Sequence, residues 1–407
     1  MYSKSREEVI KMYNIKPLKK YDMQLNVPDF STRYSKIYNS HKINVIYVKD
    51  VFDNSTFRYR TYNVIEAMEK SEKYCVSCFL CRELYSLYPI IDKIDLVILQ
   101  RAKWSFELES FIHVIKSNNI KIIYDMDDMI YHTKYVPRYL NSIGDYREYT
   151  VDSFFALAKR YEIIANLCDG FIVTTSPLAE NIKKDFNKPV WILPNFLNKE
   201  QEMISNEIVK IKKKNYKSDK FVIGYFSGSN SHQRDLEIIE SALIKLTDKY
   251  DDIYLKIVGF MSLSQNLSSL KKKGRIIFEK FVPYEELQYK IGSVDLNVIP
   301  LQKHEFNECK SELKYFEASI VDTPTCATNN KVYKGVINDG IDGFICNEMD
   351  WYEKLEYIYL NKDKLDKIIS NAHNKCINMY GNNNQLNRIT KIYDEIIESI
   401  GDRNEKR

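Results

Sequence analysis

The sequence has no long apolar segment. In its 407 residues no apolar run approaches the roughly 18 residues that a membrane-spanning helix needs, and the start, MYSKSREEVIKMY, lacks the apolar core of a signal peptide. It also lacks a strong charge, because 60 Lys and Arg against 56 Asp and Glu leave a net charge of +4. A nucleic-acid partner bound through overall charge is therefore disfavoured. We expect a folded, cytoplasmic protein whose basic residues act locally.

Metal and cofactor signatures are scarce as well. Eight cysteines occur, and Cys75, Cys78 and Cys81 lie close together, but no second CxxC or CxxH pair stands at the spacing that would complete a zinc site. The segment YCVSCFL that holds them is instead typical of a buried strand. The GxGxxG and GxxxxGK(S/T) motifs of nucleotide-binding loops are absent. We therefore expect no structural zinc and no bound cofactor.

Short apolar runs do alternate with helix-length amphipathic stretches from Ile43 onward. The runs cover 43–48, 76–80, 96–100, 120–125, 170–175 and 190–194 in the first half, and 221–226, 254–260, 275–281, 295–301, 325–328 and 343–346 in the second. Such alternation predicts an α/β protein with two Rossmann-like, doubly wound domains built on parallel sheets. Ligands of such sheets bind at the carboxyl ends of the strands, so the two domains should face a shared cleft.

Composition and pattern divide the chain into five parts. A basic N-terminal arm covers 1–42, a first α/β domain 43–208, a solvated lysine-rich linker 209–220 and a second α/β domain 221–381. A C-terminal helix over 382–407 is long enough to cross back onto the first domain.

The segment GYFSGSNSHQRD (224–235) combines a strand end, a Gly/Ser/Asn turn and a helix start. Such a turn presents free backbone N–H groups and the positive end of the helix dipole, which suits a phosphate. Gly228 would let a ligand approach the backbone, and Ser229, His232 and Arg234 would add side-chain contacts. An ordinary capped helix after a strand explains the same residues, because Ser and Asn are preferred there.

The segment FNECKSELKYFEAS (306–319) has a more specific pattern. As one helix it would have an apolar stripe for packing on the sheet, with Lys310, Lys314 and Glu317 on the adjoining face. A cation near the start of this helix and a carboxylate two turns later can bind a pyrophosphate and the paired hydroxyls of a sugar. Ser311, next to Lys310, is a further candidate contact. Salt bridges along a solvated helix face are the alternative.

The second half resembles a known family. The segments IGYFSGSNSHQRDLEIIESAL, LKIVGF, FVPYEELQYKIGSVDLNVIPL, FNECKSELKYFEASIVDTPTCATN and GVINDGIDGFIC follow in the order found in the donor domain of GT-B glycosyltransferases, specifically the family-4-like group of glycosyl transferases group 1. Upstream, STFRYRTYNVIEAM, KIIYDMDDMIY and GFIVTTSPLAENIKKDFNKPVWILPN are similar to the other half of these enzymes, more loosely. The resemblance covers about residues 43–381.

This resemblance implies transfer of a sugar, with retention of anomeric configuration, from a nucleotide-diphosphate sugar to an acceptor held by the first domain. It implies that Glu317 binds the nucleotide ribose and that Lys310 and the turn at Gly228 bind the diphosphate. The sequence departs from the family where a glutamate usually stands eight residues before the ribose-binding one. That position is Cys309 here, and Glu308 is one place off.

The turn after Gly228 is a second departure, because the basic residue that the family has there is not cleanly matched in this sequence. His232 or Arg234 is the candidate substitute. These two departures bear on the identity of the donor sugar and on some of its contacts.

Acidic residues follow the fourth predicted strand, in YDMDDMIYHT (124–133). Asp125 and Asp127 fit a DxD pattern that holds Mn²⁺ or Mg²⁺ against a diphosphate in another glycosyltransferase fold. We favour an interpretation without metal, in which Asp127 or Asp128 orients an acceptor hydroxyl or stabilises positive charge on the sugar. His132 is a further catalytic candidate by the resemblance. An Asp-rich turn that caps the next segment is the structural alternative.

Basic residues of the first half have two interpretations each. Arg58 and Arg60, in STFRYR at the start of the first predicted helix, can face the diphosphate, an acceptor phosphate or solvent. Arg101, after the run 96–100, has the same alternatives. The lysine-rich segments KKKNYK near 212 and KKKGR near 271 can hold the protein at the anionic inner face of a cell membrane or simply keep it soluble.

The predicted acceptor is a glycan, a lipid-linked glycan or a protein, and the resemblance fits bacterial surface glycan assembly. Two rival functions stay open at this point. One is a catalytically silent partner that binds nucleotide or glycan and stabilises an active transferase, which the cysteine at 309 motivates. The other is a metal-dependent transferase that uses Asp125 and Asp127.

Overall fold

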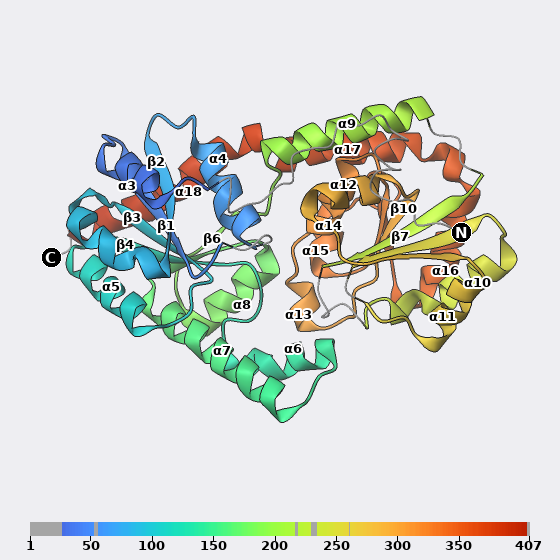
Figure 1. Ribbon diagram of the computed structural model, residues 1–407, viewed down its shortest axis with the longest axis horizontal. Helices are drawn as coiled ribbons and strands as arrows, with labels where there is room; N and C mark the ends of the chain where they lie inside the picture. Colours follow the sequence, from blue (N-terminus) through green and yellow to red (C-terminus); the bar gives the residue numbers. More distant parts are fainter. Residues whose placement is uncertain (1–26, 53–55, 216–218, 229–233, 260, 405–407) are drawn as a thin grey trace.

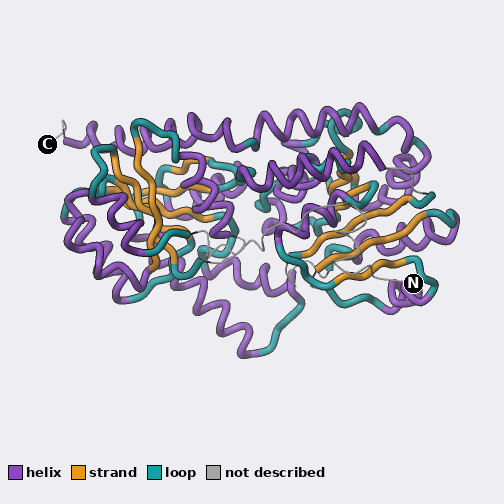
Figure 2. The backbone as a smooth tube through the Cα atoms, turned by 45° about the horizontal axis from the view of Figure 1, so that its top comes forward, coloured by secondary structure: helices purple, strands orange, loops and turns teal. Residues whose placement is uncertain are grey.

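The computed structural model describes residues 27–52, 56–215, 219–228, 234–259 and 261–404 (Figure 1). These residues form two α/β domains, each with a six-stranded sheet, and every paired strand runs parallel to its neighbours. Helices surround each group of strands (Figure 2). The predicted pair of doubly wound domains is confirmed, and each predicted apolar run holds one strand.

The first sheet has the strand order β2-β1-β3-β4-β5-β6, and the second has β12-β11-β10-β7-β8-β9. The strands are β1 (Ile43–Lys49), β2 (Tyr74–Leu80), β3 (Leu96–Gln100), β4 (Lys121–Met126), β5 (Gly170–Val173), β6 (Val190–Ile192), β7 (Phe221–Ser227), β8 (Ile253–Gly259), β9 (Ile276–Glu279), β10 (Leu296–Ile299), β11 (Thr325–Thr328) and β12 (Phe344–Cys346). The strand order reverses between β1 and β3 and between β7 and β10. Ligands of open α/β sheets bind at such switch points.

The described helices cover both faces of the sheets. They are α3 (Phe30–Tyr38), α4 (Asn63–Met68), α5 (Phe106–Ser117), α6 (Val136–Ile143), α7 (Glu148–Leu167), α8 (Ser176–Phe186), α9 (Lys199–Asn215), α10 (Glu237–Lys249), α11 (Gln265–Lys272), α12 (Tyr284–Gly292), α13 (Glu305–Glu308), α14 (Leu313–Ser319), α15 (Lys331–Val336), α16 (Trp351–Leu360), α17 (Asp366–Tyr380) and α18 (Gln385–Asn404). A π-helical turn, η1 (Arg58–Tyr62), precedes α4. No described helix is long and apolar enough to cross a membrane.

Continuous apolar runs give strands that are buried on both faces. All residues of β2 and β3 are buried, as expected for parallel strands between two helix layers. Cys75 and Cys78 are among them, and all eight cysteines are free thiols. The strand interpretation of YCVSCFL is therefore confirmed.

One apolar core joins the two domains. It contains Val45 of β1, Ile204 of α9, Phe316 of α14 and Tyr393 of α18. Long helices lie along this side of the molecule, at the top of Figure 1. The core fixes how the two sheets face each other.

The C-terminal helix returns to the first domain, as predicted. In α18 the Tyr393 hydroxyl lies 2.9 Å from the Tyr47 hydroxyl of β1. The Tyr393 ring also meets the Tyr74 ring of β2 edge-on at 5.2 Å. Burial of these aromatic groups holds α18 in place.

The segment expected as a solvated linker, 209–220, begins inside α9. The Lys212 ammonium donates to the carbonyls of Val321 and Asp322 and to the Thr323 hydroxyl at 2.8–3.1 Å. Lysine stems can cover apolar surface while the head group finds acceptors, so a lysine-rich sequence does not require a solvated coil.

Candidate active site

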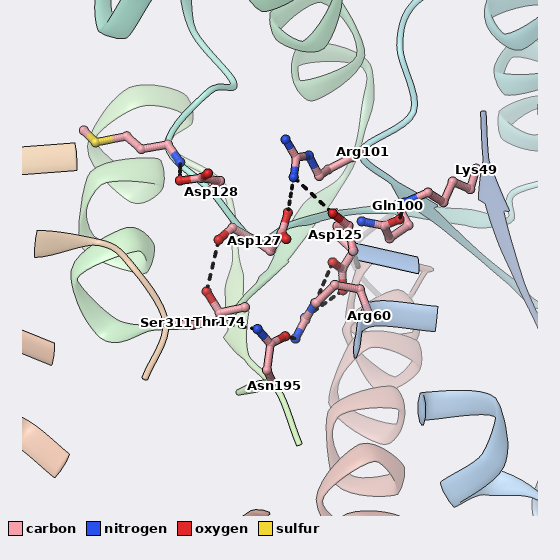
Figure 3. A network of polar contacts seen from close by, with 12 residues as sticks. Lys49, Arg60, Gln100, Arg101, Asp125, Asp127, Asp128, Thr174, Asn195 and Ser311 are labelled. Atoms are coloured by element: carbon pink, nitrogen blue, oxygen red, sulfur yellow. Dashed lines mark hydrogen bonds and ion pairs between the residues drawn. The ribbon is translucent and has the colours of Figure 1, made fainter. Parts of the chain in front are cut away.

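The carboxyl end of β4 is tied to η1 by a buried ion pair. The Arg60 guanidinium donates to both Asp125 carboxylate oxygens, at 2.9 and 2.8 Å, and neither side chain is exposed (Figure 3). Arg60 also donates to the Leu193 carbonyl at 2.6 Å and to Asn195 Oδ1 at 3.3 Å. With these partners Arg60 is not placed to meet a diphosphate or an acceptor phosphate. It positions Asp125 instead.

The same pair bears on the DxD alternative. Both Asp125 oxygens are used by Arg60, so Asp125 and Asp127 do not form a two-carboxylate cation site. In the part of the chain that the structure describes, no group of three His, Cys, Asp or Glu side chains could hold a metal ion. The residues around Asp125 therefore do not fit a bound Mn²⁺ or Mg²⁺.

Hydrogen bonds continue from this pair into the second domain. Asn195 Nδ2 donates to Ser311 Oγ at 3.2 Å, which places Ser311 against the first domain (Figure 3). The Thr175 hydroxyl donates to the Cys309 carbonyl at 3.1 Å, and Asn181 Nδ2 donates to Cys309 Sγ at 3.3 Å. Cys309 is thus a buried contact between domains.

These contacts coincide with a break in the chain. The single helix expected over 306–319 is wrong, because the structure has two short helices, α13 and α14, separated at Cys309–Glu312. In this gap the Cys309 carbonyl accepts from Thr175 of the first domain, and the Ser311 side chain accepts from Asn195. Lys310 therefore stands in the gap, and Glu317 stands on α14.

Lys310 nevertheless faces the first domain. Its ammonium lies 3.3 Å from Asp128 Oδ2, and each side chain is 20% exposed. Asp128 also accepts a hydrogen bond from its neighbour, the Met129 N–H, at 3.0 Å. The pair crosses between the domains and stays accessible to water and ligands.

Asp127 pairs with Arg101, at 3.3 Å between Oδ1 and a guanidinium nitrogen (Figure 3). Arg101 follows β3 and has a φ of 45°, in the left-handed region that non-glycine residues rarely adopt. Strained backbone of this kind clusters at functional sites. The sequence left Arg101 open between two interpretations, and its conformation favours a place in the site.

His132 has a local structural role. Its Nδ1 accepts a hydrogen bond from the Lys134 N–H at 3.2 Å and caps the short helix η3 (Thr133–Tyr135). Its ring packs near Tyr135 and Phe186. No described contact joins His132 to Asp127 or Asp128, so the structure does not bring the three catalytic candidates together.

Glu317 is buried at the domain interface. The Tyr59 hydroxyl of η1 donates to its Oε1 at 2.5 Å, and Gln201 Nε2 donates to the Tyr59 oxygen at 3.3 Å. Burial raises the pKa of Glu317, while the Tyr59 hydrogen bond and the nearby Arg58 charge oppose that shift. Burial also raises the pKa of Tyr59, so its hydroxyl remains a donor. Sequence reasoning missed Tyr59.

Arg58 also lies between the domains. Its guanidinium stacks 3.4 Å from the ring centroid of Tyr284, on α12, and 4.5 Å from that of Tyr59. A planar guanidinium is well suited to such stacking. Arg58 is therefore buried in the domain interface, where its charge acts on Glu317, whereas its neighbour Arg60 pairs with Asp125.

The turn after β7 is described in part. Gly228 is exposed, and a Cβ built there would meet no atom within 4 Å, so a ligand has room at this backbone. The Arg234 guanidinium donates to the carbonyl of Asn141, at the end of α6, at 3.2 Å. Ser229 and His232 lie outside the described residues.

Two further side chains of the second domain went unassigned in the sequence. Lys314 is on α14 near Glu317, and His304 caps α13. The KxxxKxxE spacing of 310–317 contained a signal for Lys314, but its environment could not be read from spacing.

Comparison with known proteins places this geometry in context. Residues 207–375 match the family model of glycosyl transferases group 1. No curated protein matches the chain. Several solved structures are similar in fold, and three of them are described next.

A glycosyltransferase from Rickettsia africae is 16% identical, with a TM-score of 0.61, and the match covers 88% of this chain and 99% of that one. Anabaena Alr3699/HepE in complex with UDP is 13% identical (TM-score 0.57; 87% and 100% covered). Sucrose-phosphate synthase from Thermosynechococcus elongatus is 10% identical (TM-score 0.59; 88% and 100% covered).

The second domain thus matches the glycosyl transferases group 1 model, and the whole chain has the GT-B fold of these structures.

Proposed function

We propose that the chain moves a glycosyl group, with retention of anomeric configuration, from a nucleoside-diphosphate sugar to an acceptor hydroxyl at the first domain. The observation that carries this proposal is the placement of Glu317 and Lys310. Both belong to the second domain, and both face first-domain groups, Tyr59 and Asp128. A donor bound between them would touch both domains at once.

The donor ribose is assigned to Glu317. A carboxylate can accept hydrogen bonds from both hydroxyls of a ribose, and the Tyr59 hydroxyl occupies one such position at 2.5 Å. Ribose binding thus requires that Tyr59 withdraws from Glu317. UDP-sugars are the first donors to test, because HepE was solved with UDP and with UDP-glucose.

The diphosphate is assigned to the edge formed by Lys310 and the open backbone at Gly228. Loss of the diphosphate leaves positive charge on the sugar and negative charge on the leaving group, so the rate depends on how well both are stabilised. Asp127 and Asp128 lie across from Lys310 and are placed to stabilise the sugar or orient the acceptor hydroxyl. Closure around the donor would exclude water as a competing nucleophile.

The proposed acceptor is a glycan, a lipid-linked glycan or a protein, in bacterial surface glycan assembly. TarM, similar in fold with 16% identity and a TM-score of 0.54, was solved with α-GlcNAc-glycerol and UDP in a mutant form, which supports a search among cell-surface acceptors. Lysines on α11 and α9 would bring the enzyme to an anionic membrane.

A donor panel tests the proposal. Nucleotide release from UDP-, GDP- and ADP-sugars is measured with and without EDTA, in the presence of candidate acceptors, for the parent, Lys310→Ala and the surface control Lys70→Ala. Turnover that survives EDTA and Lys70→Ala but falls at least tenfold in Lys310→Ala is expected. Loss with EDTA would support metal dependence. Nucleotide binding without turnover would support the silent partner.

A further inference from the structure

Lys314 lies at the switch point of the second sheet. Its carbonyl accepts a hydrogen bond from Asn297 Nδ2, on β10, at 3.2 Å. Its ammonium lies 5.3 Å from the ring centroid of Tyr225, on β7. The strand order reverses between β7 and β10, so Lys314 lies beside the two strands that flank the switch point. Ligands of open α/β folds bind at the carboxyl ends of such strands.

The Lys314 ammonium is buried, and in the described part of the chain no acceptor meets it. Its nitrogen is shielded from solvent and has no hydrogen-bond partner among the described residues. Asp235, Lys310 and Glu317 are the charged groups that act on it, and burial lowers its pKa to about 8. Glu317 accepts from Tyr59 instead, and Asp235 accepts from Gln302.

Lys212 shows that burial alone does not leave a lysine unpartnered. Burial lowers its pKa to about 8 as well, but its ammonium has three oxygen acceptors, two carbonyls and a hydroxyl. Buried ammonium groups are costly unless hydrogen bonds satisfy them. Of these two buried lysines, only Lys314 has no acceptor among the described residues.

The His304 ring carries a second buried donor that meets no acceptor among the described residues. Its Nδ1 accepts a hydrogen bond from the Asn307 N–H at 3.3 Å, so Nε2 carries the proton of the neutral ring. Burial lowers the His304 pKa, and Asp235 and Lys310 act on it, as they do on Lys314. Across the described ranges no acceptor meets this Nε2, which is itself buried.

We propose that Lys314 is the main diphosphate-binding cation of the donor site, with His304 Nε2 as a second donor to the phosphate oxygens. Lys310, which also pairs with Asp128 of the first domain, is then a second and more exposed cation for the same phosphates. This inference rests on the proposed function, because it assigns the phosphates of the same donor.

Titration calorimetry tests the assignment with UDP, uridine and inorganic pyrophosphate on the parent, Lys314→Met, Lys310→Met and the surface control Lys70→Met. We expect Lys314→Met to weaken UDP and pyrophosphate binding at least tenfold, more than Lys310→Met does, and to change uridine binding less than twofold. In buffers of different ionisation enthalpy near pH 8.5, UDP binding should take up protons in the parent and not in Lys314→Met.

Equal UDP binding by Lys314→Met and the parent overturns the inference and leaves the proposed function intact. If the parent binds no nucleotide but binds pyrophosphate through Lys314, the proposed function fails and the anion site stands. If the parent binds neither, both fail. Thermal unfolding checks the fold, and Lys314→Gln, with the same expected loss, replaces the Met variant if that variant does not fold.

Discussion

The two domains differ in how their charged side chains near the domain interface are paired. On the first domain, Arg60 is matched by Asp125 and Arg101 by Asp127. On the second, the Lys314 ammonium is buried without an acceptor in the described structure. These two ion pairs of the first domain form without a ligand, whereas our proposal assigns an anion to Lys314. The comparison teaches that a buried charge marks a ligand site when its partner is missing, and a scaffold when its partner is present.

Removal of Arg60 would break the scaffold side of the comparison. Arg60→Met leaves the buried Asp125 carboxylate without its counter-ion, and the free energy of unfolding should fall by about 3–5 kcal/mol. Urea denaturation measures this loss. Arg147→Met, which removes an exposed partner of Asp145, is the matched control and should change little. Equal losses in the two variants would mean that the Arg60–Asp125 pair does not support the fold.

Removal of the Glu317 carboxylate tests the ligand side. Glu317→Ala should lower kcat/KM for the nucleotide sugar about 100-fold, roughly 2.7 kcal/mol, because charge-assisted hydrogen bonds to the ribose are lost. Steady-state kinetics measure the change, and Glu356→Ala on the surface of α16 is the control. A decrease below threefold would place the ribose elsewhere.

The Lys310–Asp128 pair should contribute less, because both side chains are 20% exposed. Exposed pairs contribute about 0–1 kcal/mol and are screened by salt. Asp128→Asn should therefore raise the donor KM about two- to fivefold and flatten its dependence on salt. A salt dependence identical to that of the parent would show that the pair does not help the domains close.

The smallest expected effect is on stability against pH. The folded protein raises the pKa of Glu317 from 4.5, so the stability that this group contributes is full below pH 4.5 and is lost as pH rises through the folded pKa. Glu317→Gln keeps an acceptor for Tyr59 without the charge. Its melting temperature should exceed that of the parent at pH 8, and the difference should shrink towards pH 4.5. A constant difference across this range would show that Glu317 titrates as it does in the unfolded chain.

The strands could be predicted because strands that are buried on both faces have short, continuous apolar sequences. The break between α13 and α14 could not, because the periodicity of 306–319 is unbroken. It depends on Thr175 and Asn181, which lie 134 and 128 residues from Cys309.

Arg60 is another case of distant control. Arginine is usually exposed, and the partner that buries it, Asp125, lies 65 residues away in the sequence. For the site, Lys310 and Glu317 were both predicted from the sequence as donor-binding residues, and their roles stay predictions. Tyr59 and His304 became candidates only when distant elements were brought together, and for Lys314 the spacing gave its face of the helix but not its lack of an acceptor in the described structure.

The central claim is that Glu317 holds the donor ribose between the two domains. Calorimetry of UDP and 2′,3′-dideoxy-UDP, on the parent and on Glu317→Ala, tests it most directly, because the cycle isolates the contact between one side chain and the ribose hydroxyls. The account predicts that loss of these hydroxyls weakens binding at least tenfold in the parent and less than twofold in Glu317→Ala. Equal discrimination by both proteins would contradict it.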